Sequence, residues 1–336
     1  MTRLLVVRLG SLGDLVHTLP AVAALHRAHP DADIDWLVDA VHRPFLELVP
    51  ILSSIVELRD RGVRGWLEAR RTLRRRHYDV AVDFQGLLKS AALGRLSGAQ
   101  RVVGFDRAAA REGAAAAFYG QRVAVADDQH VIRKNLALAA ALGASGDALE
   151  FPIRTVTSPA IAAVIADIGS PYAVLNTGAA WPNKRWPAAR LGAVATHLRE
   201  RHGLSSVILW GPGEGDAARA AVDASAGAAR MAPEIGLADL TALVAGARLM
   251  LSGDTGPTHI AAALGVPIVA LFGPTNPRRN GPWDDADVVL SRYDACDCHY
   301  ERRCRRDDAD WCLGAITVDE VVAAVDERLR RARALA

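Results

Sequence analysis

The polar bend SGDTGPTH, residues 252–259, holds the residues best suited to bind a phosphorylated sugar. The backbone amides of Thr255 and Gly256 lie where a helix is expected to begin, and a helix N-terminus attracts anions. Asp254 would repel a phosphate, so it suits a neutral polyol next to a diphosphate. His259 follows one helical turn later, on the same side. A nucleotide-diphosphate sugar satisfies all of these features, whereas a plain cap and core helix leave His259 and the glycines without a role.

Two further bends of the second half offer a cation and a carboxylate. In NTGAAWPNKRWP, Gly178 permits close approach to a ligand, and Lys184 lies between two Trp-Pro pairs that stiffen the loop. A rigid loop with a cation suits phosphate binding, because less entropy is lost when the ligand binds. In SVILWGPGEGD, Glu214 or Asp216 can accept paired hydrogen bonds from a ribose diol. Either acid can instead cap the next helix, and the second Trp-Pro pair can simply start one.

In the first half, the bend RLGSLGDLVHTLP places an acid at a helix start. Gly10 and Gly13 permit a tight turn, but the pattern does not match G-x-G-x-x-G, which disfavours an NAD oxidoreductase. Asp14 is a good helix cap, because an acid there complements the helix dipole. Taken alone, this bend therefore favours capping over chemistry for Asp14.

The bend DFQGLLKSAAL, residues 83–93, adds an amide and a second cation. Gln85 supplies the amide, Gly86 a flexible backbone, and Lys89 a positive charge in the first turn of the following helix. A cation is unfavourable at that place on dipole grounds. Either an anionic partner explains Lys89, or it is an ordinary exposed lysine.

Strands must position these bends, and short apolar runs alternating with Ala/Leu-rich segments predict an α/β protein with parallel sheets. Residues 150–159, EFPIRTVTSP, carry two prolines and little periodicity, which indicates a linker. We expect two Rossmann-like, doubly wound domains, residues 1–155 and 156–316, that face a central cleft, with ligands outside the carboxyl ends of the strands. A last amphipathic helix, residues 317–336, is a candidate to pack back on the N-terminal domain. The predicted strands are residues 4–9, 34–38, 79–84, 101–105, 172–177, 206–211, 249–254 and 268–273.

Composition excludes several classes of protein. A chain of 336 residues fits about two domains of roughly 150 residues, and its 51% hydrophobic content with a net charge of +2 is untypical of a nucleic-acid binder. There is no signal-peptide pattern and no apolar run of roughly 18 residues, so a cytoplasmic protein is expected. The arginine-rich residues 61–77 form either a solvated helix face or a contact with an anionic surface.

These motifs resemble those of glycosyltransferase family 9, the bacterial ADP-heptose:lipopolysaccharide heptosyltransferases. The similarity covers nearly the whole chain. GDLVHTLP and DFQGLLKSA look most like the heptosyltransferase I type, which acts on Kdo, whereas NTGAAWPNKRWP looks more like the broader family. The other matching motifs are REGAAAAFY, KRWP, WGPGE and SGDTGPTHIAAALG with the following ALFGPT.

The resemblance implies a GT-B fold and an inverting transfer that requires no metal or other cofactor. It makes Asp14 the catalytic base, in place of the capping role. The donor residues that it implies are Lys184 on the phosphate, Ile235 with its backbone on adenine, Glu214 on ribose, and Asp254, Thr255, Gly256 and His259 on the sugar and diphosphate. The acceptor side is then formed by Gly13, Gln85, Lys89 and Arg111.

The expected reaction is transfer of heptose from ADP-heptose to the Kdo of a lipopolysaccharide precursor, at the cytoplasmic face of the inner membrane, with no nucleic-acid partner. Asp14 takes the proton of the acceptor hydroxyl, and Lys184 with the amides after Asp254 stabilises the departing ADP. Closure of the cleft brings base and donor together. Three alternatives stay open: transfer to heptose or a protein serine, a GT-B sugar-nucleotide epimerase, and a non-catalytic nucleotide-sugar-binding subunit. The motifs also leave open the donor epimer and the oligomeric state.

All four cysteines fall within CDCHYERRCRRDDADWC, at Cys296, Cys298, Cys304 and Cys312. Such clustering in a cytosolic chain favours metal binding over disulfides, although a C-x-C start is less typical of structural zinc than C-x2-C. Some family members and protein-modifying relatives look similar here and are thought to hold structural iron or zinc. The cysteines therefore form either a structural metal site or, alternatively, free thiols or an opportunistic disulfide.

Overall fold

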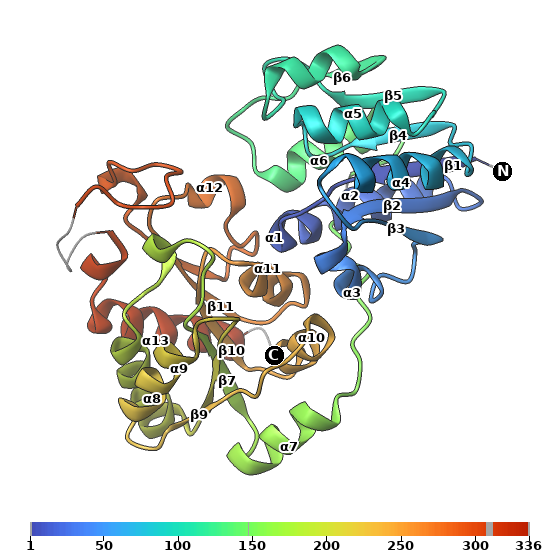
Figure 1. Cartoon of the computed structure of the whole chain (residues 1–336). Helices are drawn as coiled ribbons and strands as arrows, with labels where there is room; N and C mark the ends of the chain where they lie inside the picture. The colour runs from blue at the N-terminus through green and yellow to red at the C-terminus, as the bar shows by residue number, and fades with distance from the viewer. Residues whose placement is uncertain (1, 147, 307–311, 335–336) are drawn as a thin grey trace. The chain divides into compact units, whose positions relative to one another are not determined.

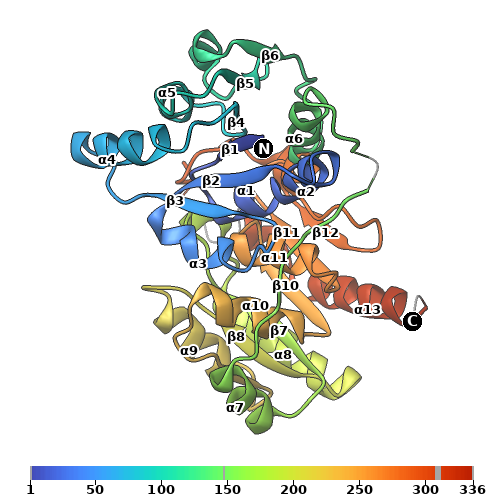
Figure 2. The same ribbon diagram turned by 90° about the vertical axis from the view of Figure 1, so that its right-hand side faces the viewer.

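The structure, a computed structural model, describes residues 2–146, 148–306 and 312–334 and divides into two compact units, Met1–Arg154 and Thr155–Ala336. The division falls within the predicted linker, which has no helix or strand before α7 begins at Pro159. Each unit is a parallel sheet flanked by helices (Figures 1 and 2). The predicted α/β class with two doubly wound sheets is thus confirmed.

In the described part of the first unit, six parallel strands pair in the order β3-β2-β1-β4-β5-β6. Strand order reverses between β1 and β4, and such a switch point is where doubly wound sheets bind ligands. The bends with Asp14 and Gln85 follow these two strands. The strands are β1 (Arg3–Val7), β2 (Asp33–Asp39), β3 (Ser54–Leu58), β4 (Val80–Asp83), β5 (Arg101–Phe105) and β6 (Gln121–Val123). The α-helices are α1 (Leu12–Val16), α2 (Leu19–Ala28), α3 (Arg43–Leu46), α4 (Val63–Arg74), α5 (Leu88–Leu96) and α6 (Val131–Ala140).

The second unit repeats this plan, with the order β12-β11-β10-β7-β8-β9 among its described strands. The switch point lies between β7 and β10, and the loop with Lys184 and the bend with Asp254 follow these strands. The strands are β7 (Tyr172–Asn176), β8 (Ser205–Leu209), β9 (Ala229–Met231), β10 (Leu249–Gly253), β11 (Ile268–Phe272) and β12 (Val288–Ser291). The α-helices are α7 (Pro159–Ile168), α8 (Ala188–His202), α9 (Gly215–Asp223), α10 (Leu237–Ala245), α11 (Gly256–Ala263), α12 (Pro277–Asn280) and α13 (Val318–Ala334).

The inner strands form the core of each unit because helices cover both of their faces. Every residue of β4, β7 and β11 is buried, and their sequences are continuous apolar runs apart from the last residue of β4, Asp83, and of β7, Asn176, as expected for a parallel sheet. The last helix, α13, packs on β11, β12 and α8 and adds Val321, Val325 and Leu329 to the core of the second unit.

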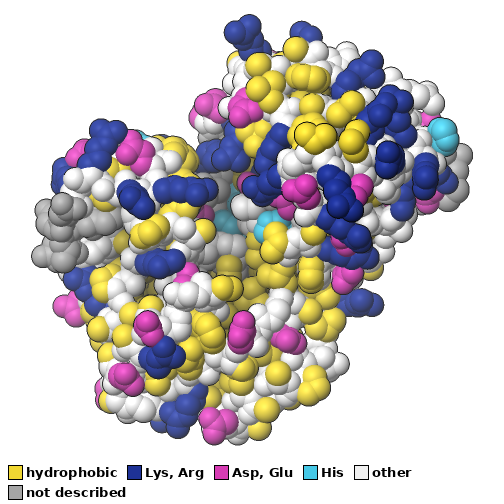
Figure 3. Space-filling view, in the orientation of Figure 1, with side chains coloured by type: hydrophobic (Ala, Val, Ile, Leu, Met, Phe, Trp, Pro, Cys, Tyr) yellow, Lys and Arg dark blue, Asp and Glu magenta, His cyan; other side chains and the backbone are white. Residues whose placement is uncertain are grey.

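Helix α4 shows how the arginine-rich segment is arranged. Its buried face consists of Gly65, Ala69 and Leu73, and most arginines between residues 61 and 75 are exposed. Figure 3 shows Lys and Arg side chains spread over the visible face of the first unit. None of the described helices is long and apolar enough to cross a membrane.

Candidate active site

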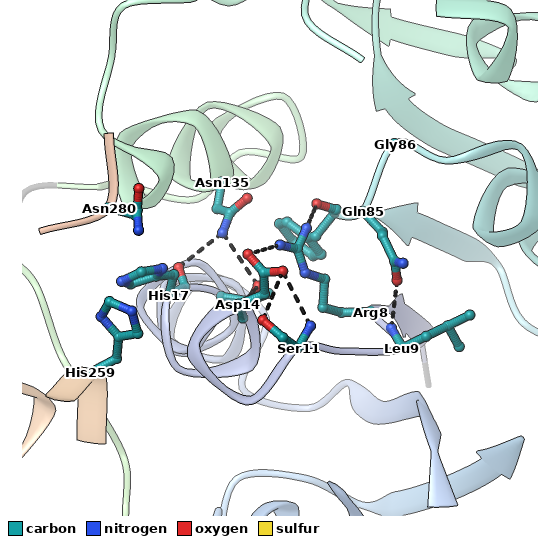
Figure 4. A network of polar contacts seen from close by, with 12 residues as sticks. Arg8, Leu9, Ser11, Asp14, His17, Gln85, Gly86, Asn135, His259 and Asn280 are labelled. Atoms are coloured by element: carbon teal, nitrogen blue, oxygen red, sulfur yellow. Dashed lines mark hydrogen bonds and ion pairs between the residues drawn. The ribbon is translucent and has the colours of Figure 1, made fainter. Parts of the chain in front are cut away.

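Asp14 lies in the first turn of α1, directly after the β1 bend, where its carboxylate contacts Arg8 and Ser11 (Figure 4). Its Oδ1 forms an ion pair with Nη2 of Arg8 at 2.6 Å. Its Oδ2 accepts hydrogen bonds from the backbone N and the hydroxyl of Ser11, at 3.2 and 3.3 Å. Asp14 therefore caps the start of α1 and still keeps 23% of its side chain exposed. A carboxylate oriented in this way can accept a proton from a bound hydroxyl group.

Arg8, directly after β1, is the cation that pairs with Asp14. Its side chain is buried, and the guanidinium donates a hydrogen bond to the Phe84 carbonyl as well as pairing with Asp14. The Arg8 carbonyl in turn accepts a hydrogen bond from Nε1 of Trp36 at 2.9 Å. Because both ends of Arg8 are held, its cation has a fixed place beside Asp14.

A buried network shapes the bend after β4. Asp83 accepts hydrogen bonds from the backbone N of Gln85 at 2.8 Å, from Ser90 Oγ at 2.8 Å and from the Tyr119 hydroxyl at 2.7 Å. Complete burial raises the pKa of Asp83, although these hydrogen bonds oppose the shift. Gly86 adopts φ +67°, and an added Cβ would lie 3.1 Å from the Arg111 backbone N.

The predicted acceptor residues occupy different places in the first unit. Gly13 is buried within α1 next to Asp14. Gln85 Oε1 accepts a hydrogen bond from the Leu9 backbone N at 2.8 Å, so this side chain ties the β4 bend to the β1 bend. Within the described residues, the side chains of Lys89 and Arg111 make no hydrogen bond or ion pair, and Arg111 is exposed. Both cations are therefore available to an anionic ligand.

Asp254 lies directly after β10, and its carboxylate contacts four side chains. Its Oδ2 lies 2.5 Å from Lys184 Nζ and accepts a hydrogen bond from the Thr275 hydroxyl at 2.7 Å. Its Oδ1 accepts a hydrogen bond from Asn280 Nδ2 at 2.8 Å and lies 3.3 Å from His259 Nε2. Burial alone would raise the pKa of Asp254, but His259 and Lys184 outweigh it and hold the pKa well below its usual range. The carboxylate is ionised at neutral pH.

The start of α11 offers backbone amides to an anion. Thr255 is the N-cap and Gly256 the first helical residue, and the first N–H groups of a helix have no acceptor within the helix. The Thr255 hydroxyl has partners of its own: Asn176 Nδ2, Ser252 Oγ and Thr258 Oγ1, each at 3.1 Å. The amides rather than this hydroxyl are thus what the bend can offer to a phosphate.

Glu214 and Ile235 follow the neighbouring strands. Glu214 Oε2 accepts a hydrogen bond from the Gly211 backbone N at 2.7 Å, and Oε1 lies 3.3 Å from Arg185 Nη2. The carboxylate lies over Gly178, where a Cβ would come within 1.9 Å of Oε2. Ile235 is half-buried in the loop between β9 and α10. Both residues therefore lie beyond carboxyl ends of the same sheet as Asp254.

Lys184 and His259 both contact Asp254 directly, so the structure brings these three predicted residues together. Arg185, the residue after Lys184, pairs with Glu214. Lys184 also lies over the Trp181 ring, 4.4 Å from its centroid. Sequence reasoning missed Arg8, Asn176, Thr275 and Asn280. Three of them could have been identified by their position in the sequence. Arg8 follows β1, Asn176 ends β7 and Thr275 follows β11, and these strands border the predicted site.

The four cysteines are all free thiols and form two close pairs. Cys298 Sγ lies 3.6 Å from Cys304 Sγ, and Cys312 lies beside Cys296. Burial, together with the neighbouring Cys296, raises the pKa of the Cys312 thiol to about 12. Backbone N–H groups point at three sulfurs: Cys298 N at Cys296, Arg305 N at Cys298 and Arg306 N at Cys304. Tetrahedral ligation at about 2.3 Å separates sulfurs by about 3.8 Å, which the Cys298–Cys304 pair satisfies. No three of the four sulfurs lie within 4.8 Å of one another, so the described residues show two pairs and not a formed four-thiolate site.

A family model described as glycosyltransferase family 9 (heptosyltransferase) matches residues 66–309. The chain belongs to glycosyltransferase family 9. It is therefore a glycosyltransferase, as the resemblance of its motifs predicts. The two Rossmann-like sheets agree with the GT-B fold of such enzymes.

Named relatives support the same family. Lipopolysaccharide heptosyltransferase 1 of Pseudomonas aeruginosa is 34% identical over 308 residues, which cover 88% of this chain and 85% of the relative. The Salmonella typhimurium protein of the same name is 31% identical over 294 residues, 82% of this chain and 89% of the relative. The solved structure of Escherichia coli heptosyltransferase WaaC with ADP matches with a TM-score of 0.79 at 25% identity, over 97% of this chain and 100% of that one.

Proposed function

We propose that this enzyme transfers heptose from ADP-heptose to the Kdo region of the lipopolysaccharide inner core. The observation that carries the proposal is the cluster of Lys184, Asp254 and His259 at the start of α11, in a family 9 chain. A cation, an ionised carboxylate and helix amides are what a sugar diphosphate requires. The relative from Pseudomonas aeruginosa is named lipopolysaccharide heptosyltransferase 1, and WaaC was solved with ADP and with a fluorinated ADP-heptose.

In this proposal the second unit binds the donor. The donor domain comprises residues 156–316 of this unit, and the last helix, α13, packs against it. Lys184 and the amides of Thr255 and Gly256 bind the diphosphate. Asp254 and His259 bind the sugar hydroxyls, Glu214 binds the ribose diol, and the Ile235 backbone meets adenine. Arg185 and the Gly211 amide hold the Glu214 side chain in one orientation. This supports a role for Glu214 in ribose binding, because the side chain loses little conformational entropy when the ligand binds.

The first unit, residues 1–155, binds the acceptor and supplies the base. Asp14 accepts the proton of the acceptor hydroxyl while that oxygen forms a bond to the anomeric carbon. The bond from the anomeric carbon to ADP breaks on the opposite face, and the electron pair leaves with ADP. One displacement inverts the anomeric centre. Lys184 and the α11 amides stabilise the charge that develops on ADP, the task that a divalent ion performs elsewhere.

Base and donor residues belong to different units, so the proposal requires closure of the two units around the substrates. The acceptor side is cationic, which suits the carboxylate of Kdo and the phosphates of lipid A. Lys89 and Arg111, whose side chains are unpaired within the described residues, are the proposed contacts, with Gly13 and Gln85 shaping the bends. Because the proposed acceptor is a membrane lipid, we also propose that the enzyme acts at the cytoplasmic face of the inner membrane, where the exposed arginines of α4 would meet anionic lipids.

Incubation with ADP-heptose and Kdo2-lipid A, followed by mass spectrometry, tests the proposal. We expect one heptose added to Kdo2-lipid A and one ADP released for each transfer. Transfer only to a heptosylated acceptor or to a protein would replace the acceptor assignment. Release of free sugar without acceptor would favour an epimerase-like reaction, and tight ADP binding without turnover on any acceptor would indicate a binding subunit.

A further inference from the structure

A second cluster of ligand-type side chains lies away from the residues discussed above, where α8 meets α13. Nε2 of His197 and Nε2 of His202, both on α8, lie 2.8 and 2.6 Å from the same oxygen, Oδ1 of Asp326 on α13. The three ligand atoms all lie within 4.8 Å of one another. Among the described residues, no other set of three His, Cys, Asp or Glu brings its ligand atoms this close.

The two imidazoles converge on one point from the same helix. Their ring centroids are 5.8 Å apart, with an angle of 65° between the ring planes. Without an ion, each ring must donate its Nε2 proton to the shared carboxylate oxygen. A divalent ion can replace these two protons, because the imidazoles then bind through the same nitrogens with the proton on Nδ1.

The chemistry of this set selects the class of ion. Two imidazole nitrogens and one carboxylate oxygen suit Zn²⁺ and similar transition metals, whereas Mg²⁺ and Ca²⁺ prefer oxygen ligands throughout. The Asp326 side chain is 41% exposed, which gives water access to a fourth coordination position.

The position of the cluster gives such an ion a structural consequence. Helix α13 ends the described chain and is held on the second unit by an apolar face and by the Arg328–Asp287 ion pair at 2.8 Å. Asp326 points from α13 toward the C-terminal half of α8. An ion bound there would join the two helices through ligands that come from both.

We propose that His197, His202 and Asp326 form a binding site for a divalent transition-metal ion of the zinc class, which clips α13 to α8. The site is independent of the transfer reaction, since none of its residues has a part in donor or acceptor binding. It is also distinct from the cysteine cluster, because it contains no thiolate.

Titration of the intact chain with Co²⁺ tests this site separately from the cysteines. Thiolate ligands give an intense near-ultraviolet charge-transfer band with Co²⁺, which imidazole and carboxylate ligands lack. We expect the double variant His197→Gln/His202→Gln to bind one equivalent less Co²⁺ than the wild type in equilibrium dialysis, with any thiolate band unchanged. The variant His26→Gln/His77→Gln, which changes two histidines of the first unit, should bind as the wild type does. Equal Co²⁺ stoichiometry and affinity in the wild type and the His197/His202 variant would overturn the proposal.

A second measurement covers the case in which the double variant folds poorly. The single variant His202→Gln keeps the His197–Asp326 contact and should bind Zn²⁺ at least tenfold more weakly than the wild type by calorimetry. Zn²⁺ should also raise the melting temperature of the wild type more than that of this variant. An undiminished Zn²⁺ affinity and an equal rise in melting temperature would contradict the proposed site.

Discussion

The guanidinium of Arg8 lies 2.6 Å from the carboxylate of Asp14, and it also donates a hydrogen bond to the Phe84 carbonyl. The proposed base is therefore held by a rigid cation on one side and by Ser11 on the other. Orientation of this kind reduces the rearrangement needed when the acceptor hydroxyl arrives. Arg8 is thus proposed as a positioning residue for Asp14.

Replacing Arg8 with methionine should lower kcat for heptose transfer by roughly 10- to 100-fold, because a base displaced by about 1 Å loses that much. The KM for ADP-heptose should stay close to wild type, since Arg8 belongs to the other unit. Arg8→Lys should restore part of the rate. Arg76→Met removes a comparable ion pair, Arg76–Asp35 at 2.7 Å, and serves as the control. Steady-state kinetics in which Arg8→Met and Arg76→Met behave alike would contradict the positioning role.

Loss of the groups that hold Asp254 should weaken donor binding. Hydrogen bonds to charged groups contribute about 1.5 kcal/mol or more, so Thr275→Val or Asn280→Ala should raise the KM for ADP-heptose roughly tenfold. The affinity for ADP, which has no sugar, should change less. Thr241→Val removes a buried hydroxyl that bonds Leu237 in α10, and it controls for the loss of one threonine hydroxyl. Equal KM values for Thr275→Val and Thr241→Val would speak against the role of Thr275.

A methyl group at Gly178 should displace Glu214. The added Cβ would lie 1.9 Å from Glu214 Oε2, far inside contact distance. We expect Gly178→Ala to weaken ADP binding at least tenfold by calorimetry, the loss typical of a charge-assisted hydrogen-bonded contact. At Gly120 an added Cβ would meet only the Val102 carbonyl at 3.8 Å, so Gly120→Ala should bind ADP normally. Unchanged ADP affinity in Gly178→Ala would remove Glu214 from the donor site.

The cysteine cluster predicts bound metal in freshly purified protein. Backbone N–H groups directed at the sulfurs of Cys296, Cys298 and Cys304 can donate hydrogen bonds to metal-bound thiolates, although burial raises the pKa of the Cys304 thiol. We expect about one equivalent of zinc or iron by elemental analysis, and its loss when Cys298 and Cys304 are replaced by serine. Less than a tenth of an equivalent in the wild type would rule the site out and leave the cysteines as free thiols.

The sequence predicted the inner strands well and missed the outer ones. The eight predicted strands correspond to β1, β2, β4, β5, β7, β8, β10 and β11, with ends displaced by at most two residues. The four missed strands, β3, β6, β9 and β12, are the edges of the two sheets. Edge strands are only partly covered, and β12 has no fully buried residue, so their sequences lack the continuous apolar run that marks an inner strand.

The sequence predicted that Asp14, Lys184 and Asp254 lie in bends that follow strands, and the structure has them after β1, β7 and β10; their roles stay predictions. The site was not predictable where a partner comes from a distant segment. Asn280 reaches Asp254 from α12, 26 residues along the chain, and no periodicity marks that contact. Likewise, the hydrogen bond from Asn176 to the Thr255 hydroxyl forms because β7 pairs with β10, which the local sequence does not indicate.

The measurement that tests the central claim most directly is transfer by Asp14→Asn. Asparagine has the same shape and can still cap α1, so the fold should persist, but it cannot accept the proton. We predict that transfer to Kdo2-lipid A falls at least roughly 100-fold while ADP binds with wild-type affinity, and that the control Asp35→Asn keeps its activity. Turnover of Asp14→Asn close to the wild-type rate would show that Asp14 is not the base.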